Sequence, residues 1–155
     1  MVQKLKLLML DNQGYLKLKA DDNNDLKVFA AYLQDSVTIP QDIKYLKKNK
    51  TFICVFNRFM WEDAEKGVFR DNKRIRSALK IDEVKSVKSK NLDPKEKKAL
   101  EFLTINIDED NKKYTNINLL FSGNMTISVK VEAINATLED FSDSWKTKTK
   151  PVHKI

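Results

Sequence analysis

The sequence has too little cysteine, histidine and glycine for several common kinds of functional site. Cys54 and His153 are its one cysteine and its one histidine, so a zinc site built on these two residue types is excluded. A Cys–His or Ser-His-Asp centre would require the C-terminal histidine to fold back from about 100 residues away. The three glycines permit neither a P-loop nor a dinucleotide-binding fingerprint. We therefore expect no catalytic residue, no cofactor and no metal, and the sequence favours a protein that is not an enzyme.

Long hydrophobic runs are also missing. No stretch approaches the roughly 18–20 consecutive apolar residues that a membrane-spanning helix requires. The short apolar patch near the N-terminus is interrupted by Lys4 and Lys6 and has no small-residue cleavage site, so we expect no signal peptide. A single cysteine cannot form an intramolecular disulfide. These features predict a cytoplasmic protein that does not enter a membrane.

Arginine is scarce although the chain is basic. The net charge is +7, yet only four of the 29 basic residues are arginine. This charge is typical of proteins that bind nucleic acid or an acidic surface. A lysine-rich composition is equally typical of an AT-rich coding bias, in which case the charge has no function. The sequence leaves both explanations open.

The most informative stretch that is present is Thr51–Glu62. Apolar residues follow one another from Phe52 to Phe56, which indicates a strand covered on both faces, and the chain then turns polar at Asn57 and Arg58. One helix is predicted from about Asn24 to Gln34, because apolar residues recur there at helical spacing behind a cluster of capping residues.

The remaining segments predict further strands. Leu5–Leu10 and Tyr15–Ala20 form a hairpin, and Val37–Leu46, interrupted at Pro40, pairs antiparallel with Thr51–Trp61 and offers an exposed edge. Arg74–Lys90 reads as a long strand with a bulge or turn near Asp82. The other predictions are a strand at Leu100–Asp108 with Leu103, Ile105 and Ile107 on one face, a hairpin of Thr115–Phe121 and Met125–Ala133, and a short helix or turn carrying Ile134, Leu138 and Phe141.

Together these elements predict an α+β fold. It is a mostly antiparallel curved sheet or roll of seven to eight strands, with one helix from the N-terminal half packed on it. We expect a single domain over residues 1–145 and a flexible basic tail over residues 146–155.

Several motifs resemble those of a known family. They are the helix end Leu33-Gln34-Asp35, the run Asn57-Arg58-Phe59-Met60-Trp61-Glu62, the strand Arg74–Leu79, the hairpin around Leu119–Gly123, and Leu138–Trp145 with Pro151 and His153. In these the chain is similar, from about Leu16 to His153, to an alphaproteobacterial family known as a domain of unknown function (DUF2948). Where that family has a second glycine after Phe-Ser-Gly, this chain has Asn124. The resemblance implies a bacterial cytoplasmic protein and implies no activity.

Polar residues at the ends of the predicted helix and central strand form the candidate binding site. An arginine there would clamp a carboxylate or phosphate, and a tryptophan would stack on a ring. The alternative is a structural network in which Arg58 pairs with Asp35 or Glu62. The candidate binding residues are Gln34, Asp35, Asn57, Arg58, Trp61, Glu62, Arg74 and Arg76.

A second candidate is the carboxylate cluster Asp21, Asp22 and Asp25, which offers oxygen ligands to a hard cation. Helix capping accounts for the same residues, and the EF-hand spacing is missing. We therefore predict no metal there.

Three functions are compatible with these observations. The first is a non-enzymatic module that binds a protein partner or forms a homodimer through the strand edge at Val37–Leu46. The second is nucleic-acid binding, if the lysines at 44, 47, 48 and 50 and those at 85, 88 and 90 form one face, which the lysines of the tail would extend. The third is a small-anion or enzymatic site around Asn57, Arg58 and Glu62.

Overall fold

The structure is a computed structural model and describes residues 7–8, 15–60, 73–110, 113–142 and 145–146. These residues form twelve strands, one α-helix and two 3-10 helices. The strands are β1 (Leu7–Leu8), β2 (Lys17–Ala20), β3 (Val37–Thr38), β4 (Ile43–Leu46), β5 (Thr51–Phe59), β6 (Lys73–Ile81), β7 (Val84–Lys90), β8 (Leu100–Asp110), β9 (Tyr114–Phe121), β10 (Met125–Val131), β11 (Ala136–Asp140) and β12 (Trp145–Lys146). The helices are α1 (Asn23–Tyr32), η2 (Pro40–Asp42) and η3 (Lys47–Asn49).

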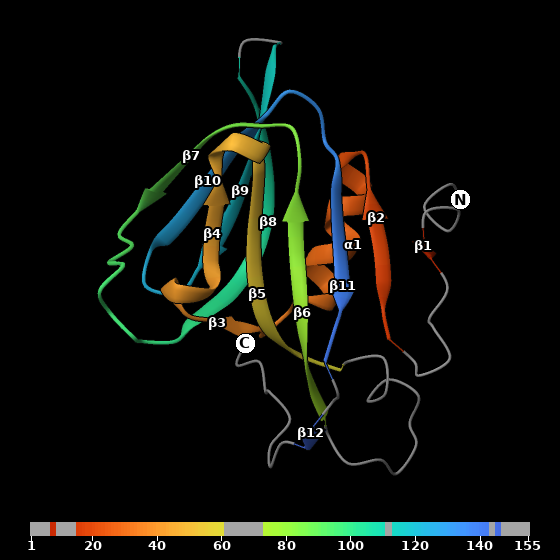
Figure 1. Ribbon diagram of the computed structural model, residues 1–155. Helices are drawn as coiled ribbons and strands as arrows, with labels where there is room; N and C mark the ends of the chain where they lie inside the picture. Colours follow the sequence, from red (N-terminus) through yellow and green to blue (C-terminus); the bar gives the residue numbers. More distant parts are fainter. Residues whose placement is uncertain (1–6, 9–14, 61–72, 111–112, 143–144, 147–155) are drawn as a thin grey trace.

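The strands build one antiparallel sheet in two parts that join at β3 (Figure 1). In the first part the order is β1-β2-β11-β6-β5, with β4 paired to β5 and β12 paired to β6. The short strand β3 pairs with both β5 and β8, and the second part continues as β8-β9-β10-β7. Strong curvature brings β7, the last strand of this order, back to the first part. There the Val84 amide donates to the Lys50 carbonyl at 2.9 Å.

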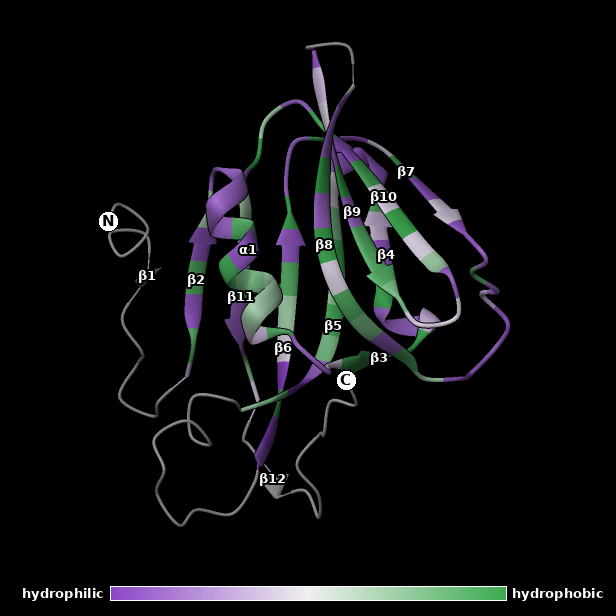
Figure 2. Ribbon diagram, turned by 180° about the vertical axis from the view of Figure 1, so that it is seen from behind, coloured by the Kyte–Doolittle hydropathy of each residue, from purple (hydrophilic) through white to green (hydrophobic). Residues whose placement is uncertain are grey.

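The core lies between α1 and the concave side of this sheet. Alternate residues of β5, β6, β11 and β2 are buried. Figure 2 shows α1 lying on one face of this part of the sheet. Phe56, Phe102 and Phe121 form an aromatic cluster where the two parts of the sheet face each other, with ring centroids 5.6 to 6.3 Å apart. The hydrophobic core is continuous from β2 to β10. Such continuous burial supplies the main favourable term in folding.

Several sequence predictions are confirmed. The fold is α+β, dominated by an antiparallel curved sheet, and the helix occupies Asn23–Tyr32, close to its predicted bounds. The chain between Val37 and Leu46 does break at Pro40, which begins η2, and β4 does pair antiparallel with β5. The β9–β10 hairpin is present, and its inward-facing Met125, Ile127, Val129 and Val131 are all buried.

Three predictions are wrong. Ile134–Phe141 is not helical, because β11 inserts between β2 and β6 and buries Ala136, Leu138 and Asp140 at strand spacing. Leu103 does not share the buried face of β8. A β-bulge at that position leaves its side chain 51% exposed, while Phe102 and Ile105 point inward. The number of strands exceeds seven to eight, because β11 was missed and because two-residue strands such as β3 leave no periodic pattern.

The bulge or turn predicted near Asp82 is a turn at which the chain changes the strand with which it pairs. The chain turns at Asp82 and Glu83, where Glu83 has a φ of 58°. β6 then stays between β5 and β11, while β7 pairs with β10 in the other part of the sheet. The two halves of the predicted long strand therefore lie in different parts of the fold.

Candidate functional site

Arg58 lies in a buried ion pair with Asp140. Its Nε and Nη2 atoms donate to the two carboxylate oxygens of Asp140 at 3.1 and 2.8 Å, and both side chains have no exposed surface. Ser77 also donates to this carboxylate, and so does the Leu16 amide at 2.8 Å. The Tyr32 ring lies 5.8 Å from the guanidinium carbon. The network joins β5, β6, β11 and α1, and it leaves Arg58 no surface on which to clamp a dissolved anion.

The other predicted binding residues that the structure describes lie apart from Arg58. Side chains alternate along a strand, so Asn57 points to the outer face of the sheet, as Arg74 and Arg76 do on β6. Arg74 donates from Nη1 to the carbonyls of Asn57 at 3.1 Å and Asp35 at 3.4 Å. Burial lowers the pKa of Arg74, and the charge of Asp35 opposes part of that shift.

Gln34 and Asp35 end the helix region, with Gln34 exposed and Asp35 half-buried in the left-handed conformation at a φ of 62°. Arg76 pairs with Asp42 at 3.5 Å and lies 5.9 Å from the ring centre of Phe141. Trp61 and Glu62 lie outside the described residues. The sheet therefore separates Arg58, on its buried face, from Asn57, Arg74 and Arg76 on its outer face. That they bind a ligand stays a prediction.

Two of the three carboxylates at the start of α1 accept hydrogen bonds from nearby backbone amides. The Asp22 side chain accepts from the Asp25 amide at 2.8 Å, and the Asp25 side chain accepts from the Asp21 amide at 3.0 Å. Their oxygens lie within 4.8 Å of one another, so they have the spacing of a cation site. These hydrogen bonds account for Asp22 and Asp25, which satisfy amides at the helix start.

Cys54 points into the core from the middle of β5. Its side chain has no exposed surface, and its sulfur donates to the Thr38 hydroxyl at 3.8 Å. Burial raises the pKa of the thiol to about 12, although the hydrogen bond with Thr38 acts in the opposite direction. A thiol that stays protonated in the core is a poor nucleophile.

The two groups of lysines that lie far apart in sequence are brought together where β7 returns to β4. The Val84 amide bonds to Lys50, and the Tyr45 hydroxyl donates to the Lys85 carbonyl at 3.4 Å. All the lysines on these segments are exposed. We call this surface the lysine face: Lys44, Lys47, Lys48, Lys50, Lys85, Lys88 and Lys90.

The lysine face carries little compensating charge. None of its seven ammonium groups forms an ion pair with a carboxylate among the described residues. Nearby, Asp82 accepts from the Thr51 hydroxyl at 2.8 Å and lies 3.9 Å from Lys80. Glu83 is exposed in the same turn. The surface is therefore a site of positive potential.

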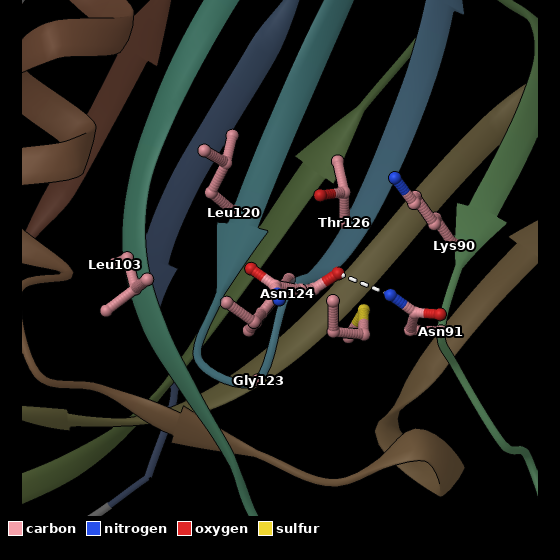
Figure 3. A pocket seen from close by; sticks show the side chains of 9 residues that line it. Lys90, Asn91, Leu103, Leu120, Gly123, Asn124 and Thr126 are labelled. Atoms are coloured by element: carbon pink, nitrogen blue, oxygen red, sulfur yellow. Dashed lines mark hydrogen bonds between the residues drawn. The ribbon is translucent and has the colours of Figure 1, made fainter.

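A pocket of about 380 Å³ adjoins the end of this face (Figure 3). It lies at the turn of the β9–β10 hairpin, beside the ends of β7 and the bulge of β8. The Asn91 side chain closes one side by donating to the Asn124 carbonyl at 2.9 Å. The pocket is lined by Lys90, Asn91, Leu103, Leu120, Phe121, Gly123, Asn124, Met125 and Thr126.

Neither Asp140 nor this pocket was predicted from the sequence. Asp140 follows Leu138 at strand spacing, and a strand prediction for that segment would have placed its carboxylate on the buried face. The pocket depends on the bulge at Leu103 and on consecutive positive φ angles of 74° at Gly123 and 59° at Asn124. Only the Phe-Ser-Gly-Asn turn gave a local sequence signal for it.

Comparison with known proteins gives one match. A family model described as "Protein of unknown function (DUF2948)" matches residues 16–153. No curated protein and no solved structure matches the chain. Within the described ranges, no helix has the length and apolar character needed to cross a membrane.

Proposed function

The chain belongs to the DUF2948 family of proteins of unknown function, and from that premise we propose that it is a non-enzymatic module that binds nucleic acid on its lysine face. The observation that carries the proposal is the approach of β7 to β4, which unites the two lysine groups. It rests on the contacts of Val84 with Lys50 and of Tyr45 with Lys85. If the two lysine groups lay apart on the surface, they would support nucleic-acid binding no further than the net charge of the chain does.

The chemistry of this surface suits a phosphate backbone. Lysine binds phosphate as a flexible point charge and needs no fixed geometry. Each phosphate that a lysine neutralises releases condensed counterions, which favours binding at low salt. The adjoining 91–98 loop brings Lys95, Lys97 and Lys98 near η2, since Gln41 Nε2 donates to the carbonyls of Pro94 and Glu96, both at 3.4 Å.

The experiment is a salt titration of binding to labelled DNA and RNA, followed by fluorescence anisotropy. The logarithm of the association constant is expected to fall linearly with the logarithm of the salt concentration. The slope should be about −0.9 per phosphate contact for a duplex and about −0.7 for a single strand. The double variant Lys48→Gln/Lys88→Gln should bind several-fold more weakly and show a shallower slope.

The matched control is Lys19→Gln/Lys27→Gln, which removes the same charge from exposed positions on β2 and α1. It should keep the wild-type slope. Equal effects of the two variants would mean that only net charge matters, and absence of binding at low salt would refute the proposal.

A second candidate function is binding of a protein partner or a second copy along β4. Of the predicted edge Val37–Leu46, only β4 has an unpaired side. β3 pairs with strands on both sides, whereas β4 pairs only with β5 among the described strands. Leu46, the last residue of β4, is 43% exposed. An unpaired edge of this kind can accept an added strand. Light scattering should then show a dimer that Leu46→Asp dissociates; a monomer at all concentrations would count against self-association.

A further inference from the structure

The pocket and the lysine face share one residue and one side of the sheet. Lys90 lines the pocket and ends β7, and Lys88 lies two residues earlier, so the two side chains point to the same face. Lys90 is opposite Thr126 on β10, and Thr126 is opposite Leu120 on β9. A ligand that contacts Lys90 at the end of the lysine face therefore adjoins the pocket.

The lining combines apolar walls with groups that form hydrogen bonds. Leu103 and Leu120 lie on one side in Figure 3, while Lys90, Asn91 and Thr126 lie on the other, with the Gly123–Asn124 turn between them. A planar heteroaromatic ring needs this pairing, because its faces are apolar and its edge carries donors and acceptors. Proteins hold unstacked bases in the same way, between apolar side chains and polar groups that bond to the base edge.

The dimensions of the pocket agree with one base. Its volume of about 380 Å³ is near the lower end of the roughly 300–1,000 Å³ of small-molecule sites. That space is enough for a single base with its sugar. Bases in a duplex are stacked and paired, and extracting one costs a few kcal/mol, whereas a single strand presents its bases already free.

We propose that this pocket receives one unstacked nucleobase and that the nucleic acid bound on the lysine face is therefore single-stranded. This inference rests on the proposed function, which supplies the phosphate contacts along β7. It adds to that function a base-binding site beside Lys90 and a preference for single-stranded over double-stranded nucleic acid.

The test compares short single-stranded DNA, single-stranded RNA and a duplex of equal length by fluorescence anisotropy. The pocket variant is Leu103→Asn and its control is Leu46→Asn. Both leucines are exposed, at 51% and 43%, but only Leu103 lines the pocket. Wild type should prefer a single strand, and Leu103→Asn should weaken that binding about fivefold to tenfold, in line with the loss of one base contact. Leu46→Asn should keep wild-type affinity, and the salt slope should stay unchanged in both variants.

The outcomes separate the two proposals. Equal affinity for single strand and duplex, with no difference between the two leucine variants, would overturn the base pocket and leave phosphate binding intact. Failure of all three nucleic acids to bind wild type would overturn both. The DNA and RNA arms show which backbone the site prefers.

An NMR titration of the wild-type protein tests the pocket without a variant. The amide signals of Leu120, Asn124 and Thr126 should shift with a single-stranded oligonucleotide and not with inorganic polyphosphate. Shifts confined to β4, η3 and β7 would contradict a base in the pocket.

Discussion

Arg58 and Asp140 bury two opposite charges that depend on each other. Both side chains are fully buried, and Ser77 and the Leu16 amide satisfy further positions on the carboxylate. An isolated charge in such a place would be very costly, so neither charge can be removed alone without a large loss of stability. The ion pair between Arg58 and Asp140 therefore stabilises the sheet and the register of its strands.

Replacing Asp140 with alanine should lower the free energy of unfolding by about 3–5 kcal/mol, because the Arg58 charge is left buried and uncompensated. Urea denaturation measures the loss. The control is Glu139→Ala, which removes the exposed partner of Lys17 at 3.0 Å and should change stability by less than about 1 kcal/mol. Similar losses in the two variants would contradict a special role for the buried pair. The double variant Arg58→Met/Asp140→Leu should recover much of the stability.

Cys54 should be unreactive toward thiol reagents in the native protein and react fully once urea unfolds the chain. Its folded pKa is raised to about 12 by burial, so the thiolate is almost absent at neutral pH and the sulfur is out of reach. A thiol assay with and without urea measures this. Because the folded pKa is above the unfolded one, the thiol leaves stability unchanged at neutral pH. Above the ordinary value of 9.0 the thiol ionises in the unfolded chain and stays protonated in the folded one, so stability falls as the pH rises toward about 12. Rapid native labelling would show that the strand opens.

At the scale of elements, α1 depends on the capping arrangement before its first turn. Asp22 satisfies the Asp25 amide, and Asp25 reaches back to the Asp21 amide. The negative charges also lie at the positive end of the helix dipole. Since α1 covers the core side of the sheet, weakening its start weakens the core.

Asp22→Ala should lower the free energy of unfolding by about 1 kcal/mol, and Asp22→Asn should lose much less because it keeps the accepting oxygen. Thermal denaturation followed by circular dichroism measures both variants. Adding calcium to wild type should leave the melting temperature unchanged if capping is the whole role of the cluster. A calcium-dependent rise that Asp22→Asn abolishes would instead establish a cation site.

At the scale of the whole molecule, two sheet parts share one hydrophobic core. The aromatic cluster takes Phe56 from the first part and Phe102 and Phe121 from the second, while α1 contacts both β2 and β8. Neither part encloses this core alone. We therefore expect the described residues to unfold as one cooperative unit.

Chemical denaturation should accordingly show a single transition. Far-ultraviolet circular dichroism, which follows the strands, and near-ultraviolet circular dichroism, which follows the packed aromatic rings, should have the same midpoint. Phe102→Ala should shift both midpoints together and destabilise the protein by about 3–5 kcal/mol. Separate midpoints would show that the two sheet parts unfold independently, against the single-domain prediction for residues 1–145.

The sequence by itself determined those features that local periodicity and capping encode. The helix behind Asp22, the alternating β10 strand and the break at Pro40 all follow from contacts within a few residues, so they could be predicted from the chain alone. The tertiary structure decided the rest. Leu138 is compatible with both a helical and a strand pattern, and only its place between Leu18 and Leu79 makes it a strand residue.

The candidate sites divide in the same way. Arg58 was recognised as an unusual residue at the end of a buried strand, but its partner lies 82 positions away on a strand that was not predicted. The two groups of lysines could be identified from the sequence. That they lie on adjoining segments depends on the contacts between β7 and the β4–η3 region. The pocket forms where the bulge of β8 lies beside the turn of the β9–β10 hairpin. Contacts between distant segments depend on strand pairing and curvature, which are set by the packing of the whole core and leave no local pattern.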